Sequence, residues 1–187
     1  CYVDTGGHNL LITDPRNLKR FIAELRSWKF TAITGVNTLY QALVDHPDIR
    51  TVDFSSLKLT SAGGMAVLPA TAKRWKEVTG VMIHEGYGLS ETSPVVTSNP
   101  VTLAEYNGSI GLPLSSTIVS LRNDDRGEVP LGEPGELCVH GPQVMRGYWN
   151  DEAATDSAMT SDGYFRTGDI AVMDERGYFR IVDRKKD

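Results

Sequence analysis

The sequence has few cysteines and no long apolar run, and both absences narrow the class of protein. Its two cysteines, Cys1 and Cys138, are too few for a disulfide framework, which favours a reducing compartment. No apolar stretch approaches the roughly 20 residues that span a bilayer, and no signal peptide is recognisable. We therefore expect a cytoplasmic protein.

Basic patterning and nucleophile motifs are absent as well. The formal net charge is -5, and no basic stripe is interleaved with aromatic residues, which argues against nucleic acid as a partner. The histidines are scattered without metal-ligand spacing, and no Gly-x-Ser-x-Gly motif marks a serine nucleophile. A histidine-bound metal and covalent serine catalysis are therefore not indicated.

The size and the ends of the chain bear on its organisation. Its 187 residues are enough for one large domain or two small ones, and 40% of them are hydrophobic, which is ordinary for a protein with a buried core. The chain begins at Cys1 and stops in a charged stretch, residues 183–187. We expect it to be part of a longer polypeptide.

The first hundred residues alternate strand-like and helix-like segments. Strands are expected at residues 10–12, 32–34, 57–60 and 81–83. Helices are expected from Asp14-Pro15 onward, over 39–44 and over 68–78, with Gly80 as a C-terminal cap. One apolar face supports the first helix: Leu18, Phe21, Ile22, Leu25 and Trp28. Strands separated by helices predict an α/β fold with a parallel sheet and flanking helices.

The second half is richer in turns and in short alternating runs. Strands are expected at 118–121 and 136–140, a short helix at 151–159, and a hairpin over 169–182 around the turn at 174–177. This pattern predicts a small, mostly antiparallel β subdomain. The predicted divisions are an α/β subdomain at 1–100, a β subdomain at 101–182 and a hinge stub at 183–187.

Glycine-bearing segments follow three of the expected strands. They are residues 34–37, 61–65 and 85–88. Because ligands bind beyond the carboxyl ends of the strands in open parallel sheets, a shared cleft is expected there. An ordinary set of loops is the structural alternative.

Three polar segments carry groups that suit a nucleotide. Gly86 to Glu91 reads Gly-Tyr-Gly-Leu-Ser-Glu and supplies close backbone approach, an aromatic face, a hydroxyl and a carboxylate. Tyr164 to Asp169 ends in a carboxylate able to accept two hydrogen bonds from a diol. Asp183 to Asp187 is a charge run, in which Lys185 is expected to be solvated. Taken singly, each is also typical of a turn or a tail.

In this order and spacing the three segments resemble the adenylate-forming superfamily, which includes acyl-CoA synthetases. Residues 32–39, 61–67 and 135–145 are similar to those of bacterial long-chain fatty acid–CoA ligases. The resemblance covers essentially the whole chain. It implies ATP, Mg²⁺ and coenzyme A as cofactors or co-substrates, with acyl-adenylate formation followed by thioester formation.

The resemblance also implies residue roles. Tyr87 would stack on adenine, Asp169 would bind the ribose hydroxyls, and Arg184 would contact ribose or phosphate. Ser90 and Glu91 are the catalytic candidates, binding phosphate and Mg²⁺. The nucleotide site would be lined by the backbone of four glycines: Gly63, Gly64, Gly86 and Gly88. The acyl tunnel would be bordered by Gly35, Val36, Asn37, Gly64 and Met65, and Lys186 would be the hinge to a further domain.

Two parts of the superfamily pattern are not found in the sequence: a Ser/Thr/Gly-rich loop ending in Lys, and a C-terminal domain with a catalytic Lys. We therefore expect the isolated chain to be inactive as a ligase and to self-associate. The hydrophobic fatty acid substrate also suggests peripheral contact with a membrane. Other acyl, aryl or amino-acid activating enzymes, a non-catalytic nucleotide-binding module and a purely structural α/β domain stay open as alternatives.

Overall fold

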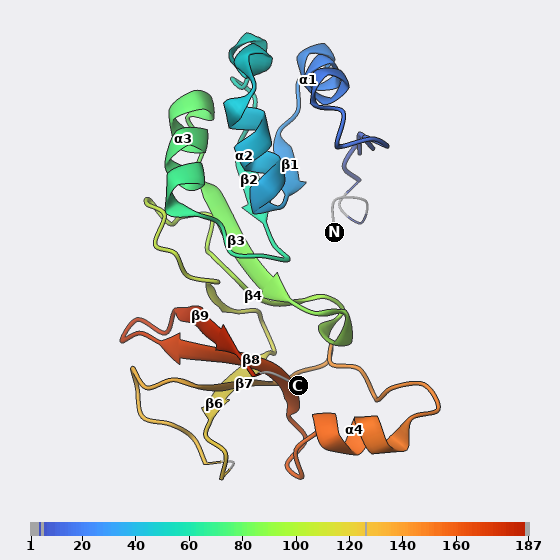
Figure 1. Ribbon diagram of the computed structural model, residues 1–187, viewed down its shortest axis with the longest axis vertical. Helices are drawn as coiled ribbons and strands as arrows, with labels where there is room; N and C mark the ends of the chain where they lie inside the picture. Colours follow the sequence, from blue (N-terminus) through green and yellow to red (C-terminus); the bar gives the residue numbers. More distant parts are fainter. Residues whose placement is uncertain (1–3, 5, 126, 186–187) are drawn as a thin grey trace.

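The computed structural model describes residues 4, 6–125 and 127–185. Its elements form two sheets with helices, stacked along the long axis of the molecule (Figure 1). The first part contains α1 (Leu18–Ser27), β1 (Ala32–Gly35), α2 (Asn37–Asp45), η1 (Pro47–Thr51), β2 (Leu59–Ala62), α3 (Pro69–Thr79), β3 (Ile83–Gly88), η2 (Ser90–Thr92), β4 (Val95–Ser98) and β5 (Leu112–Pro113). The second part contains β6 (Ile118–Arg122), β7 (Gly135–His140), α4 (Glu152–Ala158), β8 (Phe165–Met173) and β9 (Phe179–Arg184).

The first sheet confirms the predicted parallel α/β arrangement. Its strand order is β1-β2-β3-β4-β5, and β1, β2 and β3 run parallel with helices between them in sequence. The last two strands, β4 and β5, are antiparallel to their neighbours. Gly35 pairs with Ala62, and Ala62 pairs with Glu85, so β1 and β2 end level with each other while β3 continues beyond them to Gly88.

The N-terminal predictions were wrong in three places. Residues 10–12 form no strand, and β1 is the outermost strand of the first sheet on that side. The helix begins at Leu18 rather than at Asp14-Pro15, because the Asn17 side chain caps it by accepting a hydrogen bond from the Arg20 amide at 3.1 Å. Trp28 follows the helix in an extended conformation and stays partly exposed, so it does not complete the apolar face.

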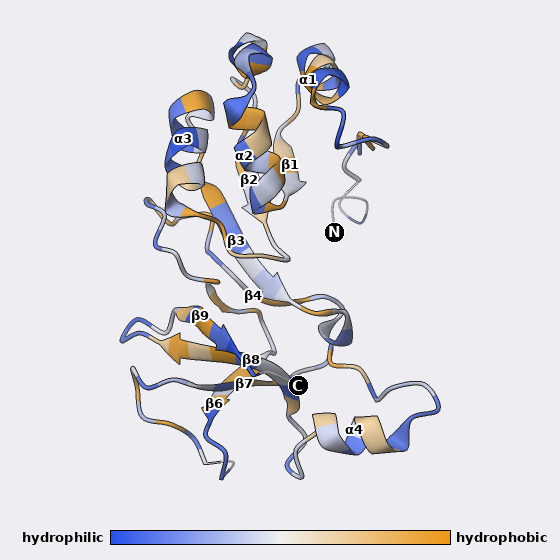
Figure 2. Ribbon diagram, viewed as in Figure 1, coloured by the Kyte–Doolittle hydropathy of each residue, from blue (hydrophilic) through white to orange (hydrophobic). Residues whose placement is uncertain are grey.

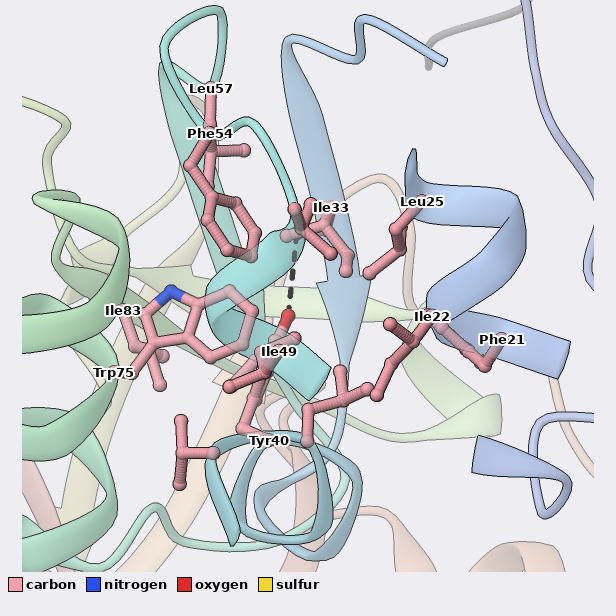
Figure 3. Packing of buried hydrophobic residues seen from close by; sticks show 14 of the residues in the cluster. Phe21, Ile22, Leu25, Ile33, Tyr40, Ile49, Phe54, Leu57, Trp75 and Ile83 are labelled. Carbon is pink, nitrogen blue, oxygen red and sulfur yellow. Dashed lines mark hydrogen bonds between the residues drawn. The ribbon is translucent and has the colours of Figure 1, made fainter. Parts of the chain in front are cut away.

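A large apolar cluster joins the helices to the first sheet (Figure 3). Tyr40 of α2 and Trp75 of α3 are fully buried with ring centroids 4.7 Å apart. Their polar atoms are satisfied: the Tyr40 hydroxyl lies 2.6 Å from the carbonyl oxygen of Ser61, and the Trp75 indole donates to the Thr60 hydroxyl at 3.1 Å. These bonds fix the helices against the strands.

The third parallel strand differs from its prediction in a way that matters for function. It covers Ile83–Gly88 rather than residues 81–83, so Gly86, Tyr87 and Gly88 lie within the strand and not in a loop beyond it. Pairing with β4 explains this extension, since a Cβ atom on Gly88 would lie 1.7 Å from the carbonyl oxygen of Pro94. In Figure 1 the strand runs from the helix-covered part toward the second sheet.

The second sheet is antiparallel, as predicted, in the order β6-β7-β8-β9. The hairpin turn at 174–177 is confirmed, with Gly177 at φ +82. The short helix α4 is also confirmed, and the Asp151 side chain caps it. However, β8 starts at Phe165, so residues 166–169 are strand rather than the turn that precedes it.

The two sheets meet through backbone bonds and a second apolar cluster. Ile110 donates to the Phe179 carbonyl at 2.8 Å, and Phe179 donates to the Gly111 carbonyl at 3.1 Å. The cluster combines Val96 of β4 with residues of the second sheet, and Tyr87 packs against it. The predicted boundary near residue 100 stays a prediction; residues 112–113 pair with β4 in the first sheet.

Hydrophobic and hydrophilic residues are mixed along α1, α2 and α3 (Figure 2), and buried and half-buried residues alternate along most of β8. Within the described part of the chain, no helix combines the length and hydrophobicity needed to cross a bilayer.

Candidate nucleotide site

Tyr87 of β3 and Asp169 of β8 meet where the first sheet reaches the second. The Tyr87 hydroxyl donates to Oδ2 of Asp169 at 2.5 Å, across 82 residues of sequence. Arg184 is the register partner of Asp169 on β9, and its Nε lies 3.8 Å from Oδ1 of Asp169. Asp169 therefore joins the three residues that were singled out from separate motifs.

The environment fixes the protonation of Tyr87. Burial of the ring, and then the hydrogen bond to Asp169, hold the pKa of Tyr87 above its ordinary value. The hydroxyl is therefore a donor at neutral pH. Because a carboxylate oxygen has two lone pairs, Asp169 can still accept hydrogen bonds from a ligand while it accepts from Tyr87.

A hollow of about 330 Å³ opens beside this pair, at the small end of the size range of ligand pockets. Glu91 and Arg184 line it, and Tyr87 and Asp169 adjoin it through Gly168 and Arg184 without lining it. Ser90 begins η2 directly before Glu91 and is exposed. The lining comprises Leu89, Glu91, Glu136, Tyr148, Ser157, Ala158, Phe165, Arg166, Thr167, Gly168, Arg184 and Lys185.

Glu91 is the carboxylate of this hollow that has no cationic partner among the described residues. Its Oε1 accepts a hydrogen bond from the Tyr148 hydroxyl at 3.0 Å, and its backbone carbonyl accepts from the Met145 amide at 2.8 Å. Among the described residues, no group of three or more acidic, histidine or cysteine side chains is placed so that it could hold a metal ion by itself. A single carboxylate fits Mg²⁺ that arrives with phosphates, because such ions use one or two carboxylates plus phosphate oxygens.

The other charges of the hollow neutralise one another. Arg166 donates to Glu136 at 2.8 Å, and Lys185 donates to Asp124 at 2.7 Å and to Glu136 at 3.3 Å. Burial raises the pKa of the Glu136 carboxyl, but the hydrogen bonds and charges of Arg166 and Lys185 outweigh it and lower the pKa. Lys185 is thus ion-paired, which corrects the expectation of a solvated side chain, and Arg184 is the exposed cation beside the hollow.

The glycine segments of the first sheet come together at its carboxyl edge. The Gly63 amide donates to the Gly35 carbonyl at 3.3 Å, and a Cβ on Gly63 would lie 3.4 Å from the Gly86 carbonyl oxygen. Similarly, a Cβ on Gly64 would lie 3.9 Å from Val36. Asn37 accepts from the Leu68 amide at 2.9 Å, while Met65 and Val36 are exposed. None of these residues lines the 330 Å³ hollow, and Lys186 lies outside the described residues.

Sequence reasoning missed a buried acid beside the glycine segment. Glu85 accepts a hydrogen bond from the Tyr106 hydroxyl at 2.5 Å and one from the Val67 amide at 3.3 Å, and burial raises its pKa. The available signal was a carboxylate two residues after the apolar run at 81–83 and directly before Gly86. Glu136 and Tyr148 were missed too, because their partners Arg166 and Glu91 lie 30 and 57 residues away.

Comparison with known proteins gives the family. The model of the AMP-binding enzyme family matches residues 2–149. The long-chain-fatty-acid–CoA ligase of Yersinia pestis is 54% identical over 186 residues, all of this chain and 33% of that protein. The chain belongs to the AMP-binding enzyme family, and it spans about a third of the length of the curated relatives it matches.

Solved structures agree. The anthranilate CoA ligase AuaEII in complex with anthranoyl-AMP matches with a TM-score of 0.87 and 26% identity, over 95% of this chain and 34% of that one. A long-chain-fatty-acid–CoA ligase from Archaeoglobus fulgidus matches with a TM-score of 0.81 and 26% identity, over 91% and 37%. These similarities place the fold among CoA ligases.

Proposed function

We propose that this chain is the central part of an AMP-forming long-chain fatty acid–CoA ligase and that its Tyr87–Asp169 corner holds the adenylate. In the proposed reaction a fatty acid carboxylate attacks the α-phosphate of ATP, which releases pyrophosphate and gives an acyl-adenylate. The thiol of coenzyme A then attacks the acyl carbon, giving a thioester and AMP. The contact of Tyr87, Asp169 and Arg184 beside a hollow that contains Glu91 carries the proposal.

Each residue has a role that its surroundings support. The ring of Tyr87, fixed by its bond to Asp169, lies against adenine. Asp169 accepts from the ribose hydroxyls, and the exposed Arg184 guanidinium donates to ribose or phosphate. The Ser90 hydroxyl donates to phosphate, and the Gly63, Gly64, Gly86 and Gly88 backbone borders the nucleotide. At position 88 the close approach of the Pro94 backbone by itself requires glycine, whether or not a nucleotide binds there.

The reaction brings a carboxylate toward a polyphosphate, so charge neutralisation and positioning supply much of the catalysis. Mg²⁺, when bound, would neutralise phosphate charge, and Glu91 is the residue that would hold it. Arg184, which also lines the hollow, would add positive charge. Arg166 and Lys185 contribute less, because Glu136 and Asp124 already neutralise them.

The remaining assignments are proposed at the carboxyl edge of the first sheet and at the end of the chain. Gly35, Val36, Asn37, Gly64 and Met65 would border the acyl tunnel. Lys186 would be the hinge to a further domain, with the α/β subdomain at 1–100 and the β subdomain at 101–182. The similarity to the Yersinia pestis ligase supports a long-chain fatty acid as the substrate. Comparing the activity of a full-length relative of the same family on long-chain fatty acids and on aryl acids would test this assignment.

We propose that the 187-residue chain binds AMP but makes no thioester, because it spans only a third of the length of its relatives. We also propose that it self-associates. One face of the first sheet is covered, with Ile33, Thr60 and Ala62 buried, whereas Thr34 on the opposite face is exposed and Ser61 is half-buried. A monodisperse monomer in light scattering would contradict self-association. A cytoplasmic location with peripheral membrane contact stays a proposal as well.

Calorimetric titration of AMP into the chain tests the proposed site. The variant Asp169→Asn should lower AMP affinity by about tenfold or more, since one charged hydrogen-bond acceptor is lost. Asp125→Asn, an exposed loop carboxylate, is the matched control and should bind AMP like the wild type. Absence of AMP binding by the wild-type chain, or equal binding by the Asp169 variant, would overturn the proposal.

A further inference from the structure

The loop between β7 and α4 holds Glu91 at two points. The Tyr148 hydroxyl donates to Oε1 of Glu91 at 3.0 Å, and the Met145 amide donates to the Glu91 carbonyl oxygen at 2.8 Å. One bond fixes the backbone of Glu91 and the other fixes its carboxylate.

The loop is itself anchored on α4. The Tyr148 amide donates to the Thr155 hydroxyl at 2.9 Å, and that hydroxyl donates to the Asp151 carbonyl at 2.8 Å. Asp151 in turn caps the helix by accepting from the Ala154 amide at 2.9 Å. A Cβ on Gly147 would lie 2.8 Å from the Thr155 side chain, so only glycine lets the loop approach this closely. The position of Tyr148 is therefore set by several independent contacts.

The consequence for Glu91 is a loss of side-chain freedom. A half-buried glutamate samples several rotamers, and a hydrogen bond to one oxygen selects among them. With Oε1 held by Tyr148, Oε2 makes no hydrogen bond to any described residue. Tyr148 also lines the 330 Å³ hollow together with Glu91, so the bond lies at the wall of the proposed site.

We propose that Tyr148 is a positioning residue for Glu91: its hydroxyl orients the carboxylate so that Oε2 is free to take the divalent cation that accompanies the phosphates of ATP. The inference rests on the proposed function. The segment Gly147 to Thr155 is the support that holds Tyr148 in place for this task.

The test is calorimetric titration of ATP into the 187-residue chain, with Mg²⁺ or with a chelator, alongside AMP in chelator. Tyr148→Phe should weaken Mg²⁺-dependent ATP binding by roughly 3- to 10-fold, the effect of one hydrogen bond, and leave AMP affinity unchanged. In a Glu91→Gln background the same change should have no further effect. Trp149→Phe, the next residue in sequence and 91% exposed, is the matched control.

Each outcome decides between the roles. Equal losses of AMP and Mg²⁺–ATP affinity would assign Tyr148 a purely structural role and overturn the inference, as would unchanged binding or losses that add to those of Glu91→Gln. A wild-type chain that binds AMP but shows no effect of Mg²⁺ on ATP affinity would overturn the metal role of Glu91 and this inference together. A wild-type chain that binds no AMP contradicts the proposed function itself.

Discussion

Each of the two parts of the molecule is stabilised internally by a different kind of interaction. The part around β1, β2 and β3 has an apolar interior in which Tyr40, Phe54 and Trp75 pack edge to face. The part around β6 to β9 has a smaller apolar cluster. It adds side-chain ion pairs such as Arg122 with Asp162 and Arg166 with Glu136.

The difference has a functional consequence. Aromatic packing forms a buried frame from which β3 projects, whereas the second sheet presents charged groups on β7, β8 and β9. The proposed nucleotide site combines the two, since Tyr87 comes from the frame and Asp169 from the charged sheet. Variants that affect one part more than the other therefore test how independent the two parts are.

The largest effect is expected at the junction of the two sheets. In Gly111→Ala the new Cβ would lie 2.0 Å from the Ser98 backbone at a φ of +94, so we expect a loss of roughly 4 kcal/mol or more. Gly108→Ala is the matched control, because it has a positive φ of +66 but nothing within 4 Å; it should cost about 1 kcal/mol. Chemical denaturation measures both, and equal losses would contradict the steric argument.

The next effect tests the apolar frame. Trp75→Ala removes a fully buried side chain and should cost about 3–5 kcal/mol in the free energy of unfolding. Trp149→Ala changes the same residue type where 91% of it is exposed, and it should stay within about 0.5 kcal/mol of the wild type. A small loss at Trp75 in denaturant titrations would show that the aromatic cluster is not what stabilises this part.

A smaller effect is expected from the ion pairs of the second sheet. Glu136→Gln leaves Arg166 and Lys185 without their shared carboxylate and should cost roughly 1–3 kcal/mol at pH 7. Because the folded-state pKa of Glu136 is lowered, its contribution exists above the ordinary value of 4.5 and is lost as pH falls through the folded-state pKa. Unfolding measured at neutral and acidic pH should therefore show the variant and wild type converging in acid; a constant gap would contradict this.

The smallest effect is a change in pH dependence at Glu85. Its folded-state pKa is raised by burial, so the stability from the protonated carboxyl is present below pH 4.5 and lost as pH rises through the folded-state pKa. Glu85→Gln should remove this slope, which is at most about 1.4 kcal/mol per pH unit for one group. Urea titrations between pH 4 and pH 8 measure it, and an unchanged slope in the variant would refute the assignment.

Local sequence patterns predicted the elements whose partners are nearby. Helix α3 with its Gly80 cap, helix α4 and the hairpin at 174–177 follow from short-range spacing and turn chemistry. The extension of β3 did not follow, because pairing with β4 after the turn outweighs the low strand preference of its two glycines.

The candidate site was predictable only in part. The motifs named Tyr87, Glu91 and Asp169, but each motif is an ordinary turn or strand by itself. The residues that support the site were not predictable, since Tyr148 and Glu136 form hydrogen bonds with partners far away in sequence. Long-range hydrogen bonds leave no periodic signal in a single sequence.

The most direct test of the account is an AMP titration of the ¹⁵N-labelled chain followed by NMR. The account predicts that the amide signals that move most belong to Gly86 to Glu91, Arg166 to Asp169 and Arg184, all around the Tyr87–Asp169 contact. The contradictory result is movement confined to a second groove, lined by residues between Arg146 and Asp156 beside α4, or no movement at all.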